Sequence, residues 1–219
     1  MAEDALVDRL SRLDSCSVSD ALDRLGLGGA VSGVRPMWPC PKIMVRAVTV
    51  KLCPAGAGRS ARHLGTAAVQ ASLPGDVIVV DNGGRSDAAG WGGILSLAAK
   101  TRSVGGVIVD GACRDVDESR EIGFPVYART AVPMTARGRI VEESFNEPVQ
   151  VGGVAVRPRD LVIADGSGVV FIASERAEEV LGVAETIAAR EAEMAKAVLA
   201  GRPVVEVMGA SYESMLERK

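Results

Sequence analysis

Aromatic residues are scarce in this chain of 219 residues, which has two Trp, two Tyr and three Phe. So few rings offer little on which bases could stack, and a net charge of −3 offers no attraction for a phosphate backbone. No apolar run approaches the roughly 18 residues that cross a membrane. The first ten residues are acidic and amphipathic, unlike a secretory signal. We therefore expect a cytoplasmic protein that binds neither nucleic acid nor a membrane.

Cysteine and histidine are also sparse. None of the four cysteines has the paired spacing that holds zinc, so we expect reduced thiols at Cys16, Cys40, Cys53 and Cys113. We interpret Cys113 as a small buried residue in a tight turn and not as an activated thiol. His63 is the single histidine, and on a predicted helix beside a glycine-rich loop such a residue is more often structural than catalytic. The sequence therefore predicts no Ser-His-Asp triad.

Glycine, by contrast, is abundant, with 25 residues that mostly lie where strands and helices would join. That distribution suits an α/β protein with many tight turns. Short apolar runs typical of buried strands, such as 77–80 and 107–109, are followed by helical patterns. The length fits one large domain, and no repeat or linker divides it. We predict a single α/β domain over residues 1–219, with a core of about 15–200 and a helical tail over 201–219.

Local signals predict several element boundaries. The sequence SVSD, which ends at Asp20, is typical of a capping box, so Asp20 is predicted to cap the second helix. The segment 26–42 is rich in glycine and proline and is predicted to be a loop. Asp165 lies in a predicted hairpin turn, where an aspartate usually binds the backbone. Ser174 is expected to cap the long final helix.

One glycine-rich loop is similar to the relaxed dinucleotide-binding fingerprint. Gly56-x-Gly58-x-x-Ala61 follows a predicted strand, and the next strand ends in Asp81, where a ribose-binding acid would lie. Two residues separate the strand from the first glycine, however, and Asp81 comes later than that acid should. We favour a plain loop, or a loop whose Arg59 reaches an active site.

The strongest chemical signal lies between residues 81 and 120. Gly92 and Gly93 immediately precede an apolar helical run that begins with Ile94 and Leu95. The N–H groups at such a helix start have no acceptor within the helix, and they lie at the positive end of its dipole. The sequence therefore predicts a site for a carboxylate or phosphate at this helix start.

A charged cluster follows the buried strand 107–109. Arg114, Asp115 and Glu118 come just after its Asp-Gly turn, and open α/β folds place their chemistry at strand ends. Taken singly, each acid could simply stabilise a solvated helix start. Their register with Gly93 favours a site in which Arg114 binds an anionic substrate and Asp115 binds a divalent metal.

The spacing of these residues resembles a known signature. Gly93, twenty residues, Arg114-Asp115, two residues and Glu118 match G-x20-R-D-x2-E/D, which is typical of class II 4-hydroxy-4-methyl-2-oxoglutarate aldolases. These enzymes belong to the RraA-like superfamily, named for the regulator of ribonuclease activity A. Further similarities extend the likeness over most of residues 15–200. The resemblance implies a swivelling β/β/α domain flanked by N- and C-terminal helices, assembled as trimers or dimers of trimers with active sites between subunits.

The resemblance also implies a reaction and roles for its residues. The reaction would be retro-aldol cleavage of a 4-hydroxy-2-oxo acid to pyruvate, with oxaloacetate decarboxylation through the same enolate and Mg²⁺ or Mn²⁺ as cofactor. Asp115 would be the direct metal ligand, while Glu118, and Glu191 from a neighbouring chain, would hold waters around the metal. Arg114 would bind the keto and carboxylate oxygens of the substrate. The helix start would bind the substrate carboxylate through Gly92, Gly93, Ile94 and Leu95.

Two departures from the family pattern leave the substrate open. Some aldolases carry an acid at the position of Gly93, and Ala61-Arg62 stand where relatives often have Asp-Asn. The alternative function is a non-catalytic regulator that binds an RNA-processing enzyme. Glu118 favours the aldolase, because the regulator branch usually lacks an acid there.

Overall fold

The computed structural model describes residues 4–56 and 63–209, and within them a nine-stranded sheet has the order β1-β11-β10-β3-β4-β5-β6-β2, with β7 paired to β3. A separate two-stranded sheet joins β8 to β9. The strands are β1 (Ala30–Val31), β2 (Arg35–Pro36), β3 (Ile43–Pro54), β4 (Val77–Ala89), β5 (Gly106–Cys113), β6 (Val126–Ala131), β7 (Ile140–Phe145), β8 (Val149–Val151), β9 (Val154–Val156), β10 (Leu161–Ala164) and β11 (Val169–Ile172). The helices are α1 (Ala5–Leu10), α2 (Ser15–Arg24), α3 (Thr66–Ala71), α4 (Gly93–Thr101), α5 (Val116–Glu121), α6 (Ala177–Leu199) and α7 (Val204–Val207).

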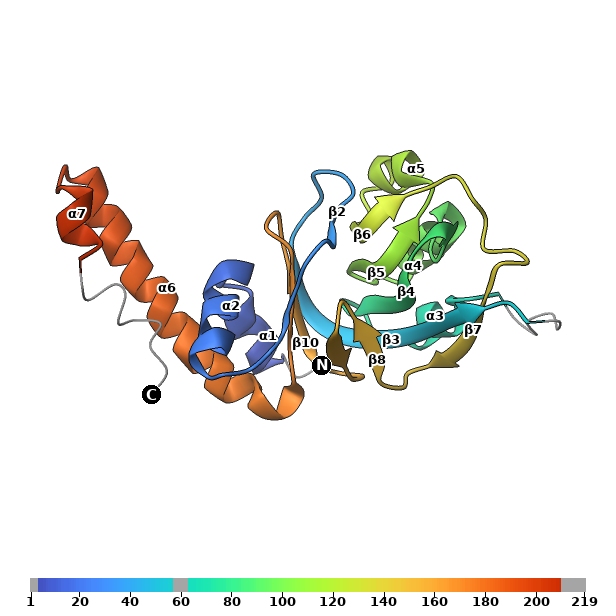
Figure 1. The fold of residues 1–219 in the computed structure, drawn as a ribbon, viewed down its shortest axis with the longest axis horizontal. Helices are drawn as coiled ribbons and strands as arrows, with labels where there is room; N and C mark the ends of the chain where they lie inside the picture. Colours follow the sequence, from blue (N-terminus) through green and yellow to red (C-terminus); the bar gives the residue numbers. More distant parts are fainter. Residues whose placement is uncertain (1–3, 57–62, 210–219) are drawn as a thin grey trace.

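Four parallel strands, β3 to β6, form the centre of the sheet. Every residue of β5 is buried, as expected of a parallel strand covered on both faces. Helices α3, α4 and α5 lie near one another beside these strands (Figure 1). Because β4 and β5 are parallel neighbours, their carboxyl ends meet at one edge, and α4 and α5 both begin beyond that edge. This topology brings the glycine pair and the charged cluster together.

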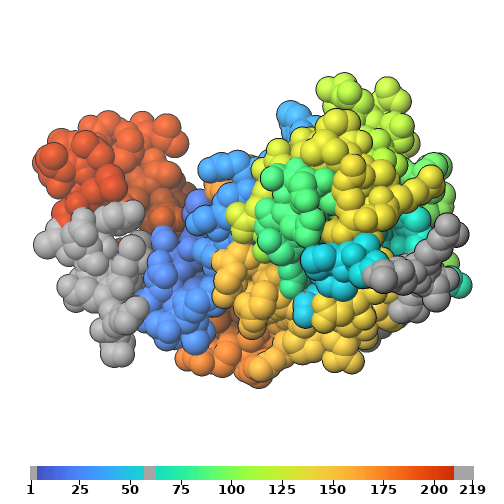
Figure 2. Space-filling model, turned by 45° about the vertical axis from the view of Figure 1, so that its right-hand side comes forward, coloured from blue at the N-terminus to red at the C-terminus, as the bar shows by residue number. Residues whose placement is uncertain are grey.

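A second group of helices packs at the other end of the molecule. Helices α1 and α2 lie against α6, beside β10 and β11, and bury a separate apolar cluster (Figure 1). The buried residues of α6 all lie between Ala177 and Ile187, and Leu199 near its end is 87% exposed. Figure 2 shows the end of α6, with α7, standing apart from the body. Among residues 4–56 and 63–209, no helix is both long and apolar enough to cross a membrane.

The predicted α/β fold is confirmed, and so are two local interpretations. The hairpin turn between β10 and β11 forms, and Asp165 binds the backbone there. The cysteines are all free thiols, and Cys113 is fully buried. Burial raises the pKa of the Cys113 thiol to about 12, which excludes an activated thiolate.

Several boundary predictions are wrong. The strand predicted to end at Asp81 continues to Ala89 as β4, and the strand predicted to end at an Asp-Gly turn continues to Cys113 as β5. Asp14 caps α2, in a capping box with Ser17, so Asp20 lies inside the helix and the box begins three residues earlier than predicted. Segment 26–42 is not all loop, because β1 and β2 pair with β11 and β6. The hydroxyl of Ser174 donates to Arg159 O, and α6 begins after a 3₁₀ turn with no side-chain cap.

Asp165 connects the N-terminal helices to the sheet. Its buried carboxylate accepts hydrogen bonds from Ser15 N at 2.9 Å, Ser15 Oγ at 2.7 Å and Ser167 N at 2.9 Å. Burial alone would raise the pKa of Asp165, but these donors outweigh it and lower the pKa below its ordinary value. The ionised carboxylate is therefore stabilised by folding.

Asp165→Ala is expected to lower the free energy of unfolding at pH 7 by about 3 kcal/mol, because buried donors lose a charged acceptor. A depressed folded-state pKa means that this stabilisation is complete above about pH 4 and is lost as the pH falls through the folded-state pKa. Urea unfolding of the wild type and of Asp165→Ala at neutral and acid pH measures the two free energies of unfolding. The difference between these free energies should narrow at acid pH, and a difference that does not change with pH would contradict the lowered pKa of Asp165.

Candidate active site

A pocket of about 380 Å³ opens where the starts of α4 and α5 meet. Arg114 and Asp115 line it on one side, beyond the end of β5. Apolar side chains that include Leu64 and Trp91 line other parts of the wall. The structure thus brings into one pocket the charged pair and the helix start that the sequence singled out, namely Gly92, Gly93, Ile94 and Leu95.

Asp115 has the most unusual geometry in the pocket. Its φ of 57° and ψ of 42° place it in the left-handed region, which is uncommon and strained for a residue with a side chain. It occupies the position that caps α5, yet its side chain makes no capping bond there. Oδ2 instead accepts a hydrogen bond of 2.9 Å from Gly93 N at the start of α4, and lies 3.3 Å from Arg114 Nε. Asp115 therefore bonds to the start of the neighbouring helix α4 and not to that of its own helix.

Gly92 and Gly93 are closely surrounded by charged side chains. A side chain on Gly93 would collide with the Glu118 carboxylate. A Cβ on Gly92 would lie 2.9 Å from Asp115 Oδ2 and 3.2 Å from Arg114 Nε. The φ of Gly92 is −156°, which any residue can adopt, so a larger residue there would be opposed by the side chains of Asp115 and Arg114 and not by the backbone. Three charged side chains thus pack directly onto the start of α4.

The structure differs from expectation at the amide of Gly93. That N–H was predicted to bind the substrate carboxylate, but it donates to Asp115. The amides of Ile94 and Leu95 follow in the first turn of α4, where N–H groups have no acceptor within the helix. These two amides are therefore the better donors for an anion in the pocket.

Glu191 is not brought to this pocket within one chain. Helix α6, which carries it, lies at the opposite end of the molecule from α4 and α5 (Figure 1). Burial raises the pKa of Glu191, and the charges of Asp14 and Asp20 raise it further, which places its carboxylate beside α2. Burial likewise raises the pKa of Asp20, with Asp23 and Asp14 adding to the shift. Two partly buried carboxylates therefore lie near each other on this face.

The donors in the pocket suit a hydrated cation better than a cation enclosed by protein ligands. Within the described residues, no group of three or more His, Cys, Asp or Glu is placed to hold a metal. Asp115 lines the pocket, and the Glu118 carboxylate lies over Gly93 beside it. Mg²⁺ typically binds one or two carboxylates and keeps several waters, so this donor set fits such an ion.

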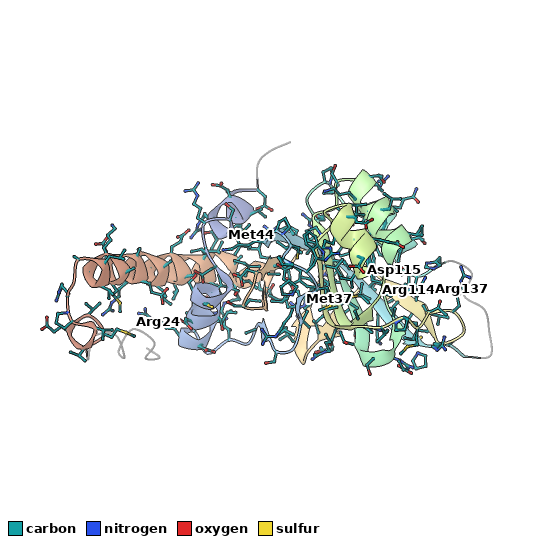
Figure 3. The ribbon with its side chains drawn as sticks, turned by 90° about the horizontal axis from the view of Figure 1, so that it is seen from above. Arg24, Met37, Met44, Arg114, Asp115 and Arg137 are labelled. Carbon is teal, nitrogen blue, oxygen red and sulfur yellow. The ribbon has the colours of Figure 1, made fainter. Side chains whose placement is uncertain are left out.

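Part of the pocket wall comes from residues without a recognisable sequence signal. Thr135 and Arg137 line it from the segment between β6 and β7, which has no motif that would have revealed them. Figure 3 shows Arg137 on the same side of the molecule as Arg114 and Asp115. His63 also lines the pocket, and it precedes α3 instead of lying on a helix as predicted. Arg114, Arg137 and His63 therefore bring basic side chains to the pocket from three different segments of the chain.

The dinucleotide fingerprint receives no support from Asp81. Its carboxylate binds the backbone, accepting from Gly83 N at 3.0 Å and from Gln150 N at 3.2 Å. It therefore anchors the β8–β9 hairpin to the sheet. Gly58, Arg59 and Ala61-Arg62 lie outside the described residues.

Comparison with known proteins identifies relatives over most of the chain. The family model described as "RraA-like: Aldolase/RraA" matches residues 15–171. A protein of Halalkalibacterium halodurans named "Putative 4-hydroxy-4-methyl-2-oxoglutarate aldolase" is 32% identical over 212 residues, which cover 94% of this chain and 97% of that protein. Protein DlpA of Legionella pneumophila is 29% identical over 196 residues, which cover 90% of this chain and 32% of DlpA. The chain thus spans about a third of the length of DlpA.

Solved structures share the fold. An uncharacterised protein of Pseudomonas syringae superposes with a TM-score of 0.84 at 28% identity, covering 94% of this chain and 97% of that one. RraAS2 of Streptomyces coelicolor is described as an unusual member of the RNase ES inhibitor RraA protein family. It superposes with a TM-score of 0.79 at 28% identity, covering 86% of this chain and 94% of RraAS2. With the family model matching residues 15–171 and the fold shared with these structures, the chain belongs to the RraA-like (Aldolase/RraA) family.

Proposed function

We propose that this protein is a divalent-metal-dependent lyase that cleaves a 4-hydroxy-2-oxo acid to pyruvate and also decarboxylates oxaloacetate. The observation that carries the proposal is the strained Asp115, whose carboxylate turns away from its own helix to lie beside Arg114 in the pocket. Strain at a residue with no capping role is typical of functional sites. Relatives named as 4-hydroxy-4-methyl-2-oxoglutarate aldolases support the reaction class.

The two oxygens of Asp115 have different surroundings. Oδ2 is engaged by Gly93 N and lies near Arg114 Nε. Within the described residues Oδ1 has no hydrogen-bond partner, which makes it the oxygen available to a cation. We assign Glu118, which lies over Gly93, and Glu191 of a second copy to holding waters around that cation. When bound, Mg²⁺ or Mn²⁺ would supply Lewis-acid stabilisation of negative charge on the substrate oxygens.

Arg114 is suited to stabilising the enolate of pyruvate. Bond cleavage between C3 and C4, or loss of CO₂, leaves negative charge on the C2 oxygen. A planar, permanently charged guanidinium provides donors at a fixed orientation, and the ion pair of Arg114 with Asp115 restricts that orientation further. The amides of Ile94 and Leu95 would bind the C1 carboxylate of the same substrate.

We also propose that the site is completed by a second copy of the chain, in a trimer or a dimer of trimers. Ile94 lines the pocket and is 79% exposed, and Leu97 on the same helix is 48% exposed. Apolar side chains this exposed beside a pocket are suited to being covered by another subunit. The neighbouring copy would bring Glu191 to the pocket, which its own chain does not.

A regulator that binds an RNA-processing enzyme is the second candidate. The structural similarity to RraAS2, of the RNase ES inhibitor family, favours it. Such a regulator would need no strained aspartate and would form no pyruvate. Retention of a ribonuclease in a pull-down, without metal-dependent pyruvate formation, would support it over the lyase.

Arg114→Ala is expected to lower kcat/KM for pyruvate formation by about 10² to 10³-fold, because an oxyanion loses a fixed donor. Asp115→Asn should abolish the pyruvate formation that depends on Mg²⁺ or Mn²⁺, since an amide is a poor substitute for the carboxylate ligand. A coupled pyruvate assay with oxaloacetate and 4-hydroxy-2-oxo acids, with and without EDTA, measures both. Arg120→Ala is the matched control, because Arg120 pairs with Asp117 on the surface of α5. Equal activity of Arg114→Ala and Arg120→Ala would exclude the proposed role.

Glu191→Gln is expected to raise stability while lowering activity. The pKa of Glu191 is raised by burial and by Asp14 and Asp20, so its ionised form destabilises the fold above the raised pKa and ceases to do so at acid pH. We expect a gain of about 0.5 kcal/mol at pH 7, small because the group is partly exposed, which disappears near pH 4. Thermal unfolding and the pyruvate assay measure the two effects. Glu193→Gln, which breaks an exposed pair with Lys196, is the control, and full activity of Glu191→Gln would refute its placement at a neighbour's site.

A further inference from the structure

Two buried serines join α4 to α5 directly behind the pocket. Ser96 is 0% exposed and Ser119 is 1% exposed, and their hydroxyl oxygens lie 3.0 Å apart. Ser96 belongs to α4, whose start lines the pocket, and Ser119 belongs to α5, which follows Asp115. The contact between the two serines therefore connects the two helix starts from the inside.

The two helices use their serines in the same way. Each serine lies four residues after the first flanking residue of its helix and bonds to the carbonyl of that residue. Ser96 Oγ is 3.2 Å from Gly92 O, and Ser119 Oγ is 3.2 Å from Asp115 O. The buried indole of Trp91 donates to Ser96 Oγ at 2.9 Å. The result is one continuous hydrogen-bonded chain from the indole to the backbone of Asp115.

Two arrangements of the hydroxyl protons bond Ser96 to Ser119. The Trp91 N–H always donates to Ser96, because an indole nitrogen can only donate. Ser96 can then donate to Ser119 while Ser119 donates to Asp115 O, or Ser119 can donate to Ser96 while Ser96 donates to Gly92 O. In both arrangements every hydroxyl proton is used and α4 is bonded to α5. A fully satisfied polar network of this kind rigidifies the interior that surrounds it.

Asp115 is consequently held at two points. Its carboxylate bonds to Gly93 N on the pocket side, and its carbonyl accepts from Ser119 N at 3.1 Å and lies within reach of Ser119 Oγ on the buried side. A left-handed residue with a side chain persists only where its surroundings constrain it. We propose that Ser96 and Ser119 are positioning residues, which hold Asp115 in the left-handed conformation and so direct its carboxylate over the start of α4.

The effect of this positioning on metal binding and turnover rests on the proposed function, whereas the effect on Asp115 itself does not. If the serine contact is lost, the bond from Gly93 N to Asp115 Oδ2 should open more often. The exchange rate of the Gly93 amide proton reports that opening with no metal or substrate present. Groups behind a metal ligand typically change metal affinity by 10- to 100-fold when they are removed.

The experiment compares Ser119→Ala and Ser96→Ala with Ser72→Ala, in the full chain. Ser72 is the matched control, because its hydroxyl is also buried and also donates to a carbonyl four residues earlier, Ala68 O at 2.8 Å, but at the C-terminal end of α3. Three quantities are measured for each protein, namely amide exchange at Gly93 by NMR, Mn²⁺ affinity by calorimetry, and kcat and KM for pyruvate formation. Urea unfolding identifies any variant that does not fold.

We expect faster Gly93 exchange in Ser119→Ala and Ser96→Ala, with Mn²⁺ affinity reduced on the order of tenfold. Ser72→Ala should match the wild type in all three quantities. The effect of the double variant Ser96→Ala/Ser119→Ala on Gly93 exchange should be smaller than the sum of the two single effects, because the two serines share one contact. If one single variant fails to fold, the other tests the same contact from the opposite helix.

The outcomes separate this inference from the proposed function. Unchanged Gly93 exchange in the folded serine variants would overturn the positioning role, whatever the activity. Faster exchange in a protein whose wild type neither binds Mn²⁺ nor forms pyruvate would uphold the positioning role and reject the lyase. A similar loss of stability in Ser96→Ala, Ser119→Ala and Ser72→Ala, with no selective effect on Gly93 exchange, would show that the serines serve only general packing. That result would also overturn the positioning role.

Discussion

The hydrogen bond from the Gly93 amide to Asp115 Oδ2 is the contact on which the candidate site depends. It joins the start of α4 to Asp115, which immediately precedes α5. Asp115 makes this bond from the left-handed backbone conformation, which few residues other than glycine adopt. Aspartate is among those that tolerate it, since its short polar side chain can bond locally. Here the bond is to a neighbouring helix, so the cost of the conformation, about 1 kcal/mol or more, is offset by an interaction that faces the pocket.

The sheet makes this contact possible. Strands β4 and β5 are parallel and adjacent, so the segments leaving them enter the same space. The side chains of Arg114, Asp115 and Glu118 fill the space beside the glycine pair at the start of α4. The apolar clusters on either side of the sheet and under α6 stabilise this arrangement without contributing to its chemistry.

Sequence patterns identified the elements whose signals are local. Short stretches of sequence were enough to predict the buried strands, the hairpin at Asp165 and the helix α4 that begins with glycine. The spacing of Gly93, Arg114 and Asp115 indicated where the pocket would form. The cap of α2 was predicted wrongly, because the SVSD pattern is typical of a capping box while Asp14, three residues before it, forms the cap. Arg137 and the serine pair could not be found in this way. Their importance comes from contacts between segments that are distant in sequence and carry no pattern of their own.

The crowding above Gly93 limits what this position can become. The Glu118 carboxylate occupies the volume that a side chain there would need. An acid on α5 therefore already lies beside the start of α4, where an acid at residue 93 would also have to lie. An acid introduced at residue 93 would have to displace Glu118, so in this protein the negative charge near the pocket can be moved between helices more easily than it can be increased.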